Sequence, residues 1–303
     1  MAFLLASKNR KTRKINNIQR CQKLTKLLFF YPVMMGYHLG QLQVWINMLF
    51  ALACLAWIGN RQVLAGVLIG LVCLLKPQFG LFVLWALLRK EWRFLFAMCV
   101  TGAVGLLVSV ILFGFKNHLE YISVLQFLSR HGESYWANQS LNGLLHRLAG
   151  NGIGEWVAGE FPPFSPVIYT GTLFATIAIL AFALMTRRGP TPTASLFDFM
   201  LAALAFTAAS PIAWEHHYGV LAPMIAALFA ISLMRASGGQ ERYQTLALAL
   251  CVIFIANCFV MTRELTAAPF NIAQSYLYFA ALGVLALLRL RAKEGAPIAA
   301  RTA

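Results

Sequence analysis

The chain has 303 residues, of which 60% are hydrophobic and only 12% are charged, and its mean hydropathy is +0.69. Soluble domains carry about 25% charged residues, so this composition excludes a soluble domain and predicts an all-α, polytopic helical bundle in a membrane. The formal net charge of +15 does not indicate nucleic-acid binding, because the basic residues lie between apolar runs and form no single basic face.

Basic and apolar stretches alternate along the chain and predict its topology. Residues 1–26 carry eight Lys and Arg residues and no acid, which predicts a cytoplasmic tail in contact with membrane lipids. A transmembrane domain is expected over 27–290, with about eight to ten segments, followed by a second basic tail over 291–303. The apolar segments cover residues 27–38, 41–59, 63–75, 78–88, 94–115, 165–186, 196–213, 214–234, 243–261 and 272–290.

Positively charged turns predict the orientation of these segments. Lys and Arg favour the cytoplasmic side, and they lie at 89–93, 187–188, 235–242 and 289–293. We therefore expect a multi-pass protein of the plasma (inner) membrane with both termini in the cytoplasm. The long polar loop at 116–164 is then extracytoplasmic.

The first third of the chain contains two polar interruptions, His38-Leu39-Gly40-Gln41 and Lys76-Pro77-Gln78. Either 27–59 and 63–88 are long kinked helices, or each forms two short legs that break at these residues. We favour the broken form, with Arg61 cytoplasmic. It brings a set of polar residues to one extracytoplasmic face, as a binding site requires: Gln41, Lys76, Gln78, the 116–164 loop and Glu215-His216-His217.

Lys76 lies among apolar residues beside a helix-breaking proline. A cation at this depth in a membrane indicates a site, and we predict that Lys76 binds a phosphate or pyrophosphate. The alternative is a lysine whose stem snorkels to the surface. Among the nearby amides, Gln41 is a better candidate for substrate binding than Asn47, which lies too far around a helix to share its face.

Two other features of the transmembrane sequence are not expected to contribute to the site. Gly66 and Gly70 are spaced as in closely packed membrane helices, so we expect them to contact another helix and not a ligand. Asp198 is the only aspartate of the chain, and the charge topology places it at the cytoplasmic start of a helix.

The loop at 116–164 contains two helical patterns. His118–Arg130 has apolar residues at helical spacing and predicts a helix lying on the bilayer surface. Asn138–Leu148 is polar and predicts a short helix that presents Asn138, His146 and Arg147. Arg147 is a candidate for holding phosphate or, equally, the solvated end of a helix.

Glu215-His216-His217 follows Ser210-Pro211 and opens an apolar helix. A carboxylate beside two imidazoles can transfer protons or orient an anionic group, so these three residues are the candidate catalytic group. The alternative is a polar cap at the membrane interface. Adjacent histidines point about 100° apart on a helix, so we expect no metal here. The sequence contains no glycine-rich phosphate loop, no Ser/His/Asp set and no Cys/His metal cluster, and no cofactor is predicted.

Four motifs in order resemble glycosyltransferase family 87, formerly domain of unknown function 2029. The matching residues are Pro32-Val33 with Gly40-Gln41, Ala65–Gly70 leading into Lys76-Pro77, Asn138–Gly143 with His146-Arg147-Leu148, and Ser210–Tyr218. The resemblance implies a GT-C type fold. It also implies transfer of a hexose, mannose in the first instance, from a polyprenyl-phosphate donor to a lipid or glycan acceptor at the outer face. By likeness, Lys76 and Arg147 hold the donor phosphate, and His216 and His217 lie at the reacting sugar.

The chain departs from that family type in its acidic residues. GT-C enzymes generally carry a catalytic Asp or Glu in the first extracytoplasmic loop, whereas here no acid precedes Glu91. An inverting transfer needs a base for the acceptor hydroxyl. We therefore expect an N-terminally truncated chain, a substitute base such as Glu215, or an inactive protein.

Two other functions remain open from the sequence. Broken helices and an intramembrane lysine also occur in transporters, although residues 165–290 contain no counterpart of Lys76-Pro77. A non-catalytic membrane subunit derived from such a transferase is the third possibility, and the missing acid favours it.

Overall fold

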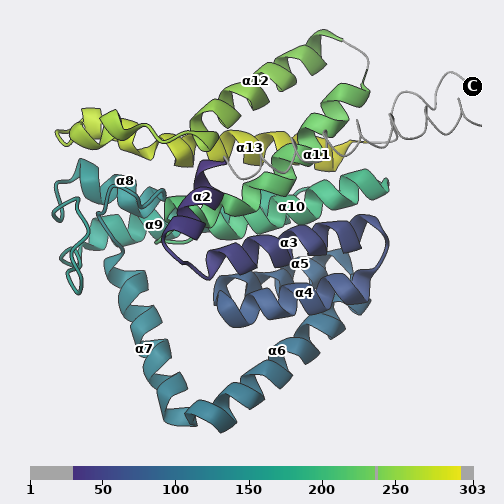
Figure 1. Cartoon of the computed structure of the whole chain (residues 1–303), viewed down its shortest axis with the longest axis horizontal. Coiled ribbons are helices and arrows are strands. Elements are labelled where there is room, and N and C mark those ends of the chain that lie inside the picture. The colour runs from purple at the N-terminus through teal and green to yellow at the C-terminus, as the bar shows by residue number, and fades with distance from the viewer. Residues whose placement is uncertain (1–29, 236–237, 295–303) are drawn as a thin grey trace, which may run out of the picture.

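The computed structural model of the protein describes residues 30–235 and 238–294, and these residues form helices without any strand (Figure 1). The predicted tail at 1–26 and residues 295–303 lie outside this part. The helices are α2 (Tyr31–His38), α3 (Gln43–Ile58), α4 (Gln62–Leu75), η1 (Pro77–Leu81), α5 (Phe82–Arg89), α6 (Trp92–Phe113), α7 (Phe115–His131), α8 (Leu141–Leu148), α9 (Pro166–Leu184), α10 (Pro192–Ala208), η2 (Glu215–Val220), α11 (Leu221–Met234), α12 (Gly239–Ala256), η3 (Val260–Glu264), η4 (Phe270–Ser275) and α13 (Tyr276–Lys293).

Eight helical stretches of the described residues are apolar enough for a membrane. Four are also long enough to cross one, namely Trp92–Phe113, Pro166–Leu184, Glu215–Met234 and Phe270–Lys293. Four are shorter: Gln43–Ile58, Gln62–Leu75, Pro77–Arg89 and Pro192–Ala208. A helix pairs its own backbone polar groups, which a lipid environment demands. The predicted helical membrane bundle, with some short segments, is confirmed.

The first third of the chain breaks at the two predicted places. Gly40 has a φ of +62°, which ends α2 and turns the chain into α3. Lys76 is extended, with φ −143° and ψ 92°, because the following proline disfavours helical backbone before it. α3 and α4 therefore form one hairpin, and α4 and α5 form a second turn at Lys76 (Figure 1).

The bundle has two chemically different ends. The loop end carries residues 132–165, the break at Lys76 and the start of η2. The arginine end is tied by two ion pairs: Arg89 contacts Asp198 at 2.8 Å, and Arg188 contacts Glu91 at 2.6 Å. Because Arg61 and Arg93 line one shallow cavity, they also lie together. The predicted grouping of these basic turns at one end is therefore present.

α10 forms the centre of the bundle and is buried along almost its whole length. It packs against α13, α9 and α3. An aromatic cluster fills the space between α10, α3 and α5, where Phe199 stacks on Trp57 with a centroid distance of 5.0 Å and meets Phe82 at 4.9 Å. Lipid tails are as apolar as these rings, so dense packing holds the helices together in place of water exclusion.

α4 and α6 approach closely at the predicted glycines. A Cβ at Gly70 would lie 2.7 Å from Thr101 Cβ, and one at Gly66 would lie 2.9 Å from Ala97 Cβ and closer still to the Phe94 carbonyl oxygen. Both distances are shorter than side chains tolerate. The prediction that these glycines serve helix packing is confirmed.

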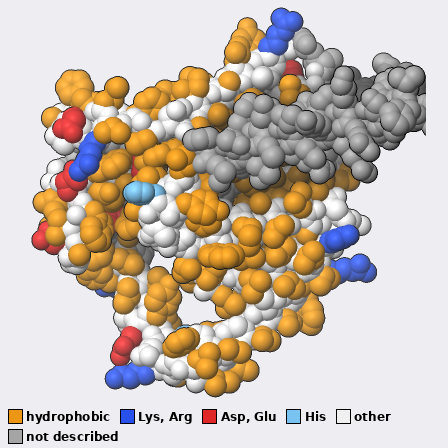
Figure 2. Space-filling model, viewed as in Figure 1, with side chains coloured by type: hydrophobic (Ala, Val, Ile, Leu, Met, Phe, Trp, Pro, Cys, Tyr) orange, Lys and Arg blue, Asp and Glu red, His pale blue; other side chains and the backbone are white. Residues whose placement is uncertain are grey.

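α6 packs against α4 over its first half and then leaves the bundle, and it meets α7 in a corner at Gly114 (Figure 1). α7 has no buried residue, and its apolar side chains, including Ile122 and Leu125, are exposed. Figure 2 shows that hydrophobic side chains cover most of this flank, with Lys and Arg at its edges. The predicted helix is present, and its position on a bilayer surface stays a prediction.

Candidate functional site

Segments far apart in the sequence meet at the loop end of the bundle. The loop after α7 pairs with the segment before η2 through a single antiparallel bridge between Asn138 and Trp214. Beside this bridge lies a cavity of about 340 Å³. Its lining residues are Met35, Leu39, Gln41, Tyr135, Trp136, Ala137, Trp156, Trp214, Glu215 and His216. The predicted convergence of Gln41 with Glu215 and the polar loop is therefore present.

Glu215 is buried and accepts hydrogen bonds from two tyrosines. The Tyr31 hydroxyl donates to Oε2 at 2.6 Å, and the Tyr276 hydroxyl donates to Oε1 at 3.3 Å. A buried carboxylate is tolerated only when such donors replace water. The three residues belong to α2, η2 and α13, so Glu215 joins the beginning, middle and end of the described chain.

The two histidines beside Glu215 have different environments. The backbone N–H of Trp214 donates to His217 Nδ1 at 3.1 Å, so this nitrogen carries a lone pair and the proton of a neutral ring lies on Nε2. The His216 ring lines the cavity and packs edge-on against Trp214, with a centroid distance of 5.5 Å. His216 is therefore the histidine that a molecule in the cavity can contact.

Lys76 is half-buried at the break between α4 and η1. Its ammonium donates to Gln43 Oε1 at 3.2 Å, and Gln43 Nε2 donates to Asn47 Oδ1 at 2.8 Å and to the His217 carbonyl at 3.5 Å. In the part of the chain that the structure describes, Lys76 makes no ion pair. Gln43 thus links this uncompensated cation to the segment that carries Glu215 and the histidines.

Asn138 fastens the loop to the segment before η2. Its amide nitrogen donates to the Glu133 and Pro211 carbonyls at 2.9 and 3.1 Å, and its Oδ1 accepts from the Ala213 N–H at 2.9 Å. Asn138 is fully buried. All these polar atoms are paired with protein, so Asn138 positions the backbone around the cavity, and its prediction as a substrate ligand stays a prediction.

Arg147 is buried in α8 and also faces the protein. Its guanidinium donates to the Tyr135 carbonyl at 2.9 Å and to Ser275 Oγ at 2.6 Å. Burial lowers the pKa of Arg147 to about 10, and the group remains a cation at neutral pH. The residue ties the loop to the start of α13, and phosphate binding by it stays a prediction.

Gln41 and Gln78 have different positions. Gln41 lies in the turn after α2 and lines the cavity. Gln78 donates to the Phe206 carbonyl at 3.2 Å, which fastens η1 to the end of α10. Only Gln41 of these two amides therefore faces the cavity.

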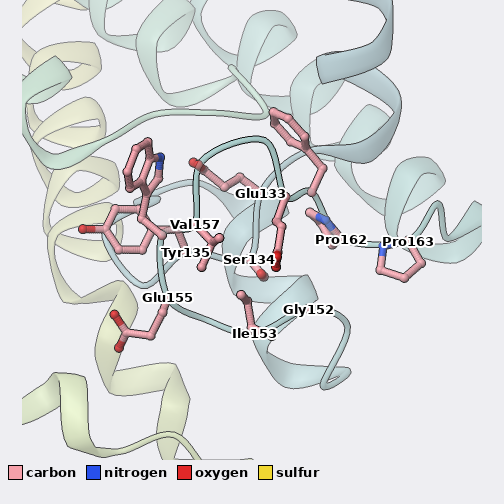
Figure 3. A pocket seen from close by; sticks show the side chains of 12 residues that line it. Glu133, Ser134, Tyr135, Gly152, Ile153, Glu155, Val157, Pro162 and Pro163 are labelled. Carbon is pink, nitrogen blue, oxygen red and sulfur yellow. The ribbon is translucent and has the colours of Figure 1, made fainter.

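Figure 3 shows a second, smaller cavity of about 160 Å³. It adjoins the first, and the two share Tyr135 and Trp156. Glu133 lines it and accepts a hydrogen bond from the Trp214 indole N–H. Burial raises the pKa of Glu133, and the indole donor opposes that shift in part. Glu133 therefore fixes one side of Trp214, whose ring lines the larger cavity.

Sequence reasoning missed Gln43, Tyr31, Tyr276 and Glu133 as site residues. Gln43 and Asn47 are spaced by four residues on a helix and share a face, which is a usable signal. The tyrosines carry no local signal, because their contacts with Glu215 join distant positions. Among the described residues, no group of three His, Cys, Asp or Glu side chains lies close enough to hold a metal ion.

Comparisons with known proteins place these features in a family. The model of glycosyltransferase family 87 matches residues 4–211. A polyprenol-phosphate-mannose-dependent alpha-(1-2)-phosphatidylinositol mannoside mannosyltransferase from Mycolicibacterium smegmatis is 25% identical over 249 residues, which cover 80% of this chain and 54% of the relative. The chain thus spans about half the length of this curated relative. No solved structure gives a significant match. Because the family model covers more than half of the 303 residues, the chain belongs to glycosyltransferase family 87.

Proposed function

We propose that the protein is a membrane glycosyltransferase that moves a mannose from a polyprenyl-phosphate donor to a lipid or glycan acceptor. The observation that carries the proposal is the meeting of Lys76, Glu215 and His216 at the loop end, beside a cavity of about 340 Å³. Family membership supports the reaction class, and the name of the mycobacterial relative supports the donor.

The donor phosphate binds to Lys76 in this proposal. The ammonium is held by Gln43 without a neutralising carboxylate among the described residues, so it attracts an anion. The helices on either side of Lys76 are apolar, and low dielectric strengthens a cation–phosphate contact. The polyprenyl chain lies in the membrane beside the apolar helices, which suits a lysine at the break between α4 and η1.

The chemical step needs a base, a nucleophile and a stabilised leaving group. Glu215 takes the proton of the acceptor hydroxyl while the hydroxyl oxygen attacks C1 of the mannose. The bond from C1 to the phosphate oxygen breaks, and its electron pair leaves with polyprenyl phosphate. Lys76 stabilises the negative charge that develops there. His216 contacts the reacting sugar, while His217, tied to the Trp214 backbone, orients the segment.

The remaining predicted substrate-binding residues act in two ways. Gln41 contacts the substrate directly from the cavity wall. Gln78, Asn138 and Arg147 act through the segments that they fasten, since their hydrogen bonds run to protein groups. The loop end faces the extracytoplasmic side of the plasma (inner) membrane and both termini lie in the cytoplasm, as the basic arginine end supports.

A transfer assay in membranes tests the proposal. Membranes that contain the 303-residue chain are incubated with polyprenyl-phosphate-linked radiolabelled mannose, and label in acceptor lipids and glycans is measured. We expect transfer that falls at least about 100-fold in Glu215→Gln, as for loss of a general base. Lys76→Ala should weaken donor binding. Lys116→Ala is the matched control, because Lys116 is an exposed lysine on α7 with 89% of its side chain accessible.

The same assay separates the alternatives. Donor binding without transfer in any condition contradicts the enzyme and supports a non-catalytic membrane subunit. Accumulation of intact donor or sugar inside proteoliposomes, without a new glycosidic bond, supports a transporter. Full transfer by Glu215→Gln contradicts the role of Glu215 as the base and leaves the transferase itself in place.

A further inference from the structure

We infer that the larger cavity is a binding site for a pyranose ring of the acceptor, formed by an aromatic pocket of Tyr135, Trp136, Trp156 and Trp214. This inference rests on the proposed transferase function and assigns the residues that hold the sugar ring of the acceptor.

The lining of the cavity suits a sugar. Aromatic faces carry negative electrostatic potential, and the C–H groups on one face of a pyranose are attracted to them. Tyr135 meets Trp136 and Trp214 at centroid distances of 5.6 and 6.2 Å, so three of the four rings form one continuous wall. Gln41, Glu215 and His216 supply polar groups at the edge of the same cavity, where hydroxyls would lie. An apolar wall with a few convergent polar groups is the usual form of a small-molecule site.

Trp136 is a fixed part of the cavity wall. The guanidinium of Arg263 covers its ring at 5.6 Å from the centroid, and Arg263 itself is held by Glu155 at 2.8 Å. The indole nitrogen is buried, so the ring presents its apolar surface to the cavity. A fixed aromatic surface is what a pyranose ring packs against.

The position of the pocket favours the acceptor over the donor. Lys76 and Gln43, which hold the donor phosphate in our proposal, do not line the cavity. Glu215 does, and it is the proposed base for the acceptor hydroxyl. The outer wall comes from loop residues Tyr135, Trp136 and Trp156. A sugar in the pocket thus reaches Glu215 from the loop side.

Glu133 is a positioning residue for this pocket. Glu133 lines the adjoining cavity (Figure 3). It accepts the hydrogen bond of the Trp214 indole, so it fixes the plane of that ring without reaching the sugar. Glu133→Ala should raise the KM for the sugar acceptor several-fold with little change in kcat. Glu133→Gln retains a side-chain oxygen that can accept the indole hydrogen bond, so its KM should match that of wild type. Equal effects on kcat and KM from both variants would contradict this role.

Sugar binding without turnover tests the pocket. The purified 303-residue protein in detergent is titrated with methyl α-D-mannopyranoside, and binding is followed by saturation-transfer NMR. Trp156→Ala should weaken binding about tenfold, the equivalent of about 1.4 kcal/mol, and Trp156→Phe should retain most of it. Trp156 is 55% exposed, so its replacement leaves the fold intact. Trp92→Ala, at a tryptophan with 60% exposure on α6, is the matched control.

The outcomes show whether the pocket binds the sugar of the acceptor or the sugar of the donor. Donor binding, measured with polyprenyl-phosphate-mannose, should be unchanged in Trp156→Ala. If it weakens in parallel, the pocket holds the donor sugar and the inference is wrong. Equal binding of the mannoside to wild type and Trp156→Ala, or no binding at all, also overturns it. A chain that binds the mannoside but never transfers mannose contradicts the proposed enzyme and retains the pocket.

Discussion

The hydroxyl of Tyr31 donates a 2.6 Å hydrogen bond to the carboxylate of Glu215, across 184 positions of the sequence. This contact fastens α2 to η2, and the two elements pack against each other around it. Glu215 is therefore both the proposed base and a structural junction, and variants of its partners should reveal which property each partner serves.

Tyr31→Phe should destabilise the protein by about 1–3 kcal/mol, because it leaves a buried carboxylate oxygen without its donor. The measurement is the unfolding midpoint of the purified protein in detergent, followed by tryptophan fluorescence. Tyr37→Phe is the control on the same helix, since Tyr37 is 60% exposed and should have no effect. Equal midpoints for Tyr31→Phe and wild type would show that the hydrogen bond contributes nothing to stability.

The arginine end depends on a buried ion pair. The side chains of Arg89 and Asp198 are 12% and 0% exposed, and Trp85 Nε1 also donates to Asp198, at 2.9 Å. Asp198→Asn leaves the guanidinium without its counter-charge, and we expect a loss of about 3–5 kcal/mol. Glu120→Gln removes one partner of an exposed pair with Lys116 and should change stability by less than about 1 kcal/mol. Similar losses from both variants would contradict this ranking.

The α4–α6 contact should tolerate no added methyl group. Gly66→Ala brings a Cβ against the Phe94 carbonyl and Ala97, so overpacking should cost about 1–3 kcal/mol. Alanine is better than glycine in a helix by about 1 kcal/mol, which offsets only part of this loss. Gly102→Ala on α6 has open space around it and should be neutral or stabilising. Thermal unfolding of the two variants in one detergent compares them, and a stabilised Gly66→Ala would contradict the contact.

Local stereochemistry explains which parts of the fold the sequence predicts. Pro77 forces the break at Lys76, and Gly40 permits the left-handed turn after α2, so both interruptions are visible without any tertiary information. The Lys and Arg residues at the helix ends then predict which breaks lie at the same end of the bundle as Glu215. The grouping of Arg61 with Arg93 and of Gln41 with Glu215 follows from this rule.

The directions of individual side chains are beyond such rules. Gln41 lies in the turn before α3, and the course of that turn decides which face of α3 meets Lys76. The contact between Gln43 and Lys76 can therefore be predicted only when the turn at Gly40 is known. Arg147 is a residue type that often binds phosphate. Here its guanidinium donates hydrogen bonds to backbone carbonyls of a loop that folds over it. Those carbonyls come from irregular backbone, whose course no periodicity encodes.

Gln43→Glu tests whether Lys76 must remain an uncompensated cation. The new carboxylate would lie at hydrogen-bonding distance from the ammonium, where Gln43 Oε1 now accepts at 3.2 Å, and would neutralise it. We expect the KM for the polyprenyl-phosphate donor to rise about tenfold or more, with the fold retained, because the phosphate then meets a paired lysine. Gln126→Glu adds the same charge on the exposed α7 and should leave this KM unchanged. A lower donor KM in Gln43→Glu would exclude phosphate binding at Lys76.

The pH dependence of stability should depend on Glu133. Burial raises its folded-state pKa above the ordinary 4.5, so the folded protein retains this proton more strongly than the unfolded chain does. The stabilisation that comes from this bound proton is therefore complete below pH 4.5, and it is lost as the pH rises through the raised pKa of Glu133. Glutamine stays neutral throughout, so the unfolding midpoint of Glu133→Gln should rise relative to the midpoint of wild type as the pH increases across this window. Glu160→Gln, at an exposed residue lining the same cavity, is the control and should show no such trend. A constant difference between wild type and Glu133→Gln at all pH values would mean that Glu133 does not titrate with a raised pKa, and that the Trp214 indole stabilises its charged form fully.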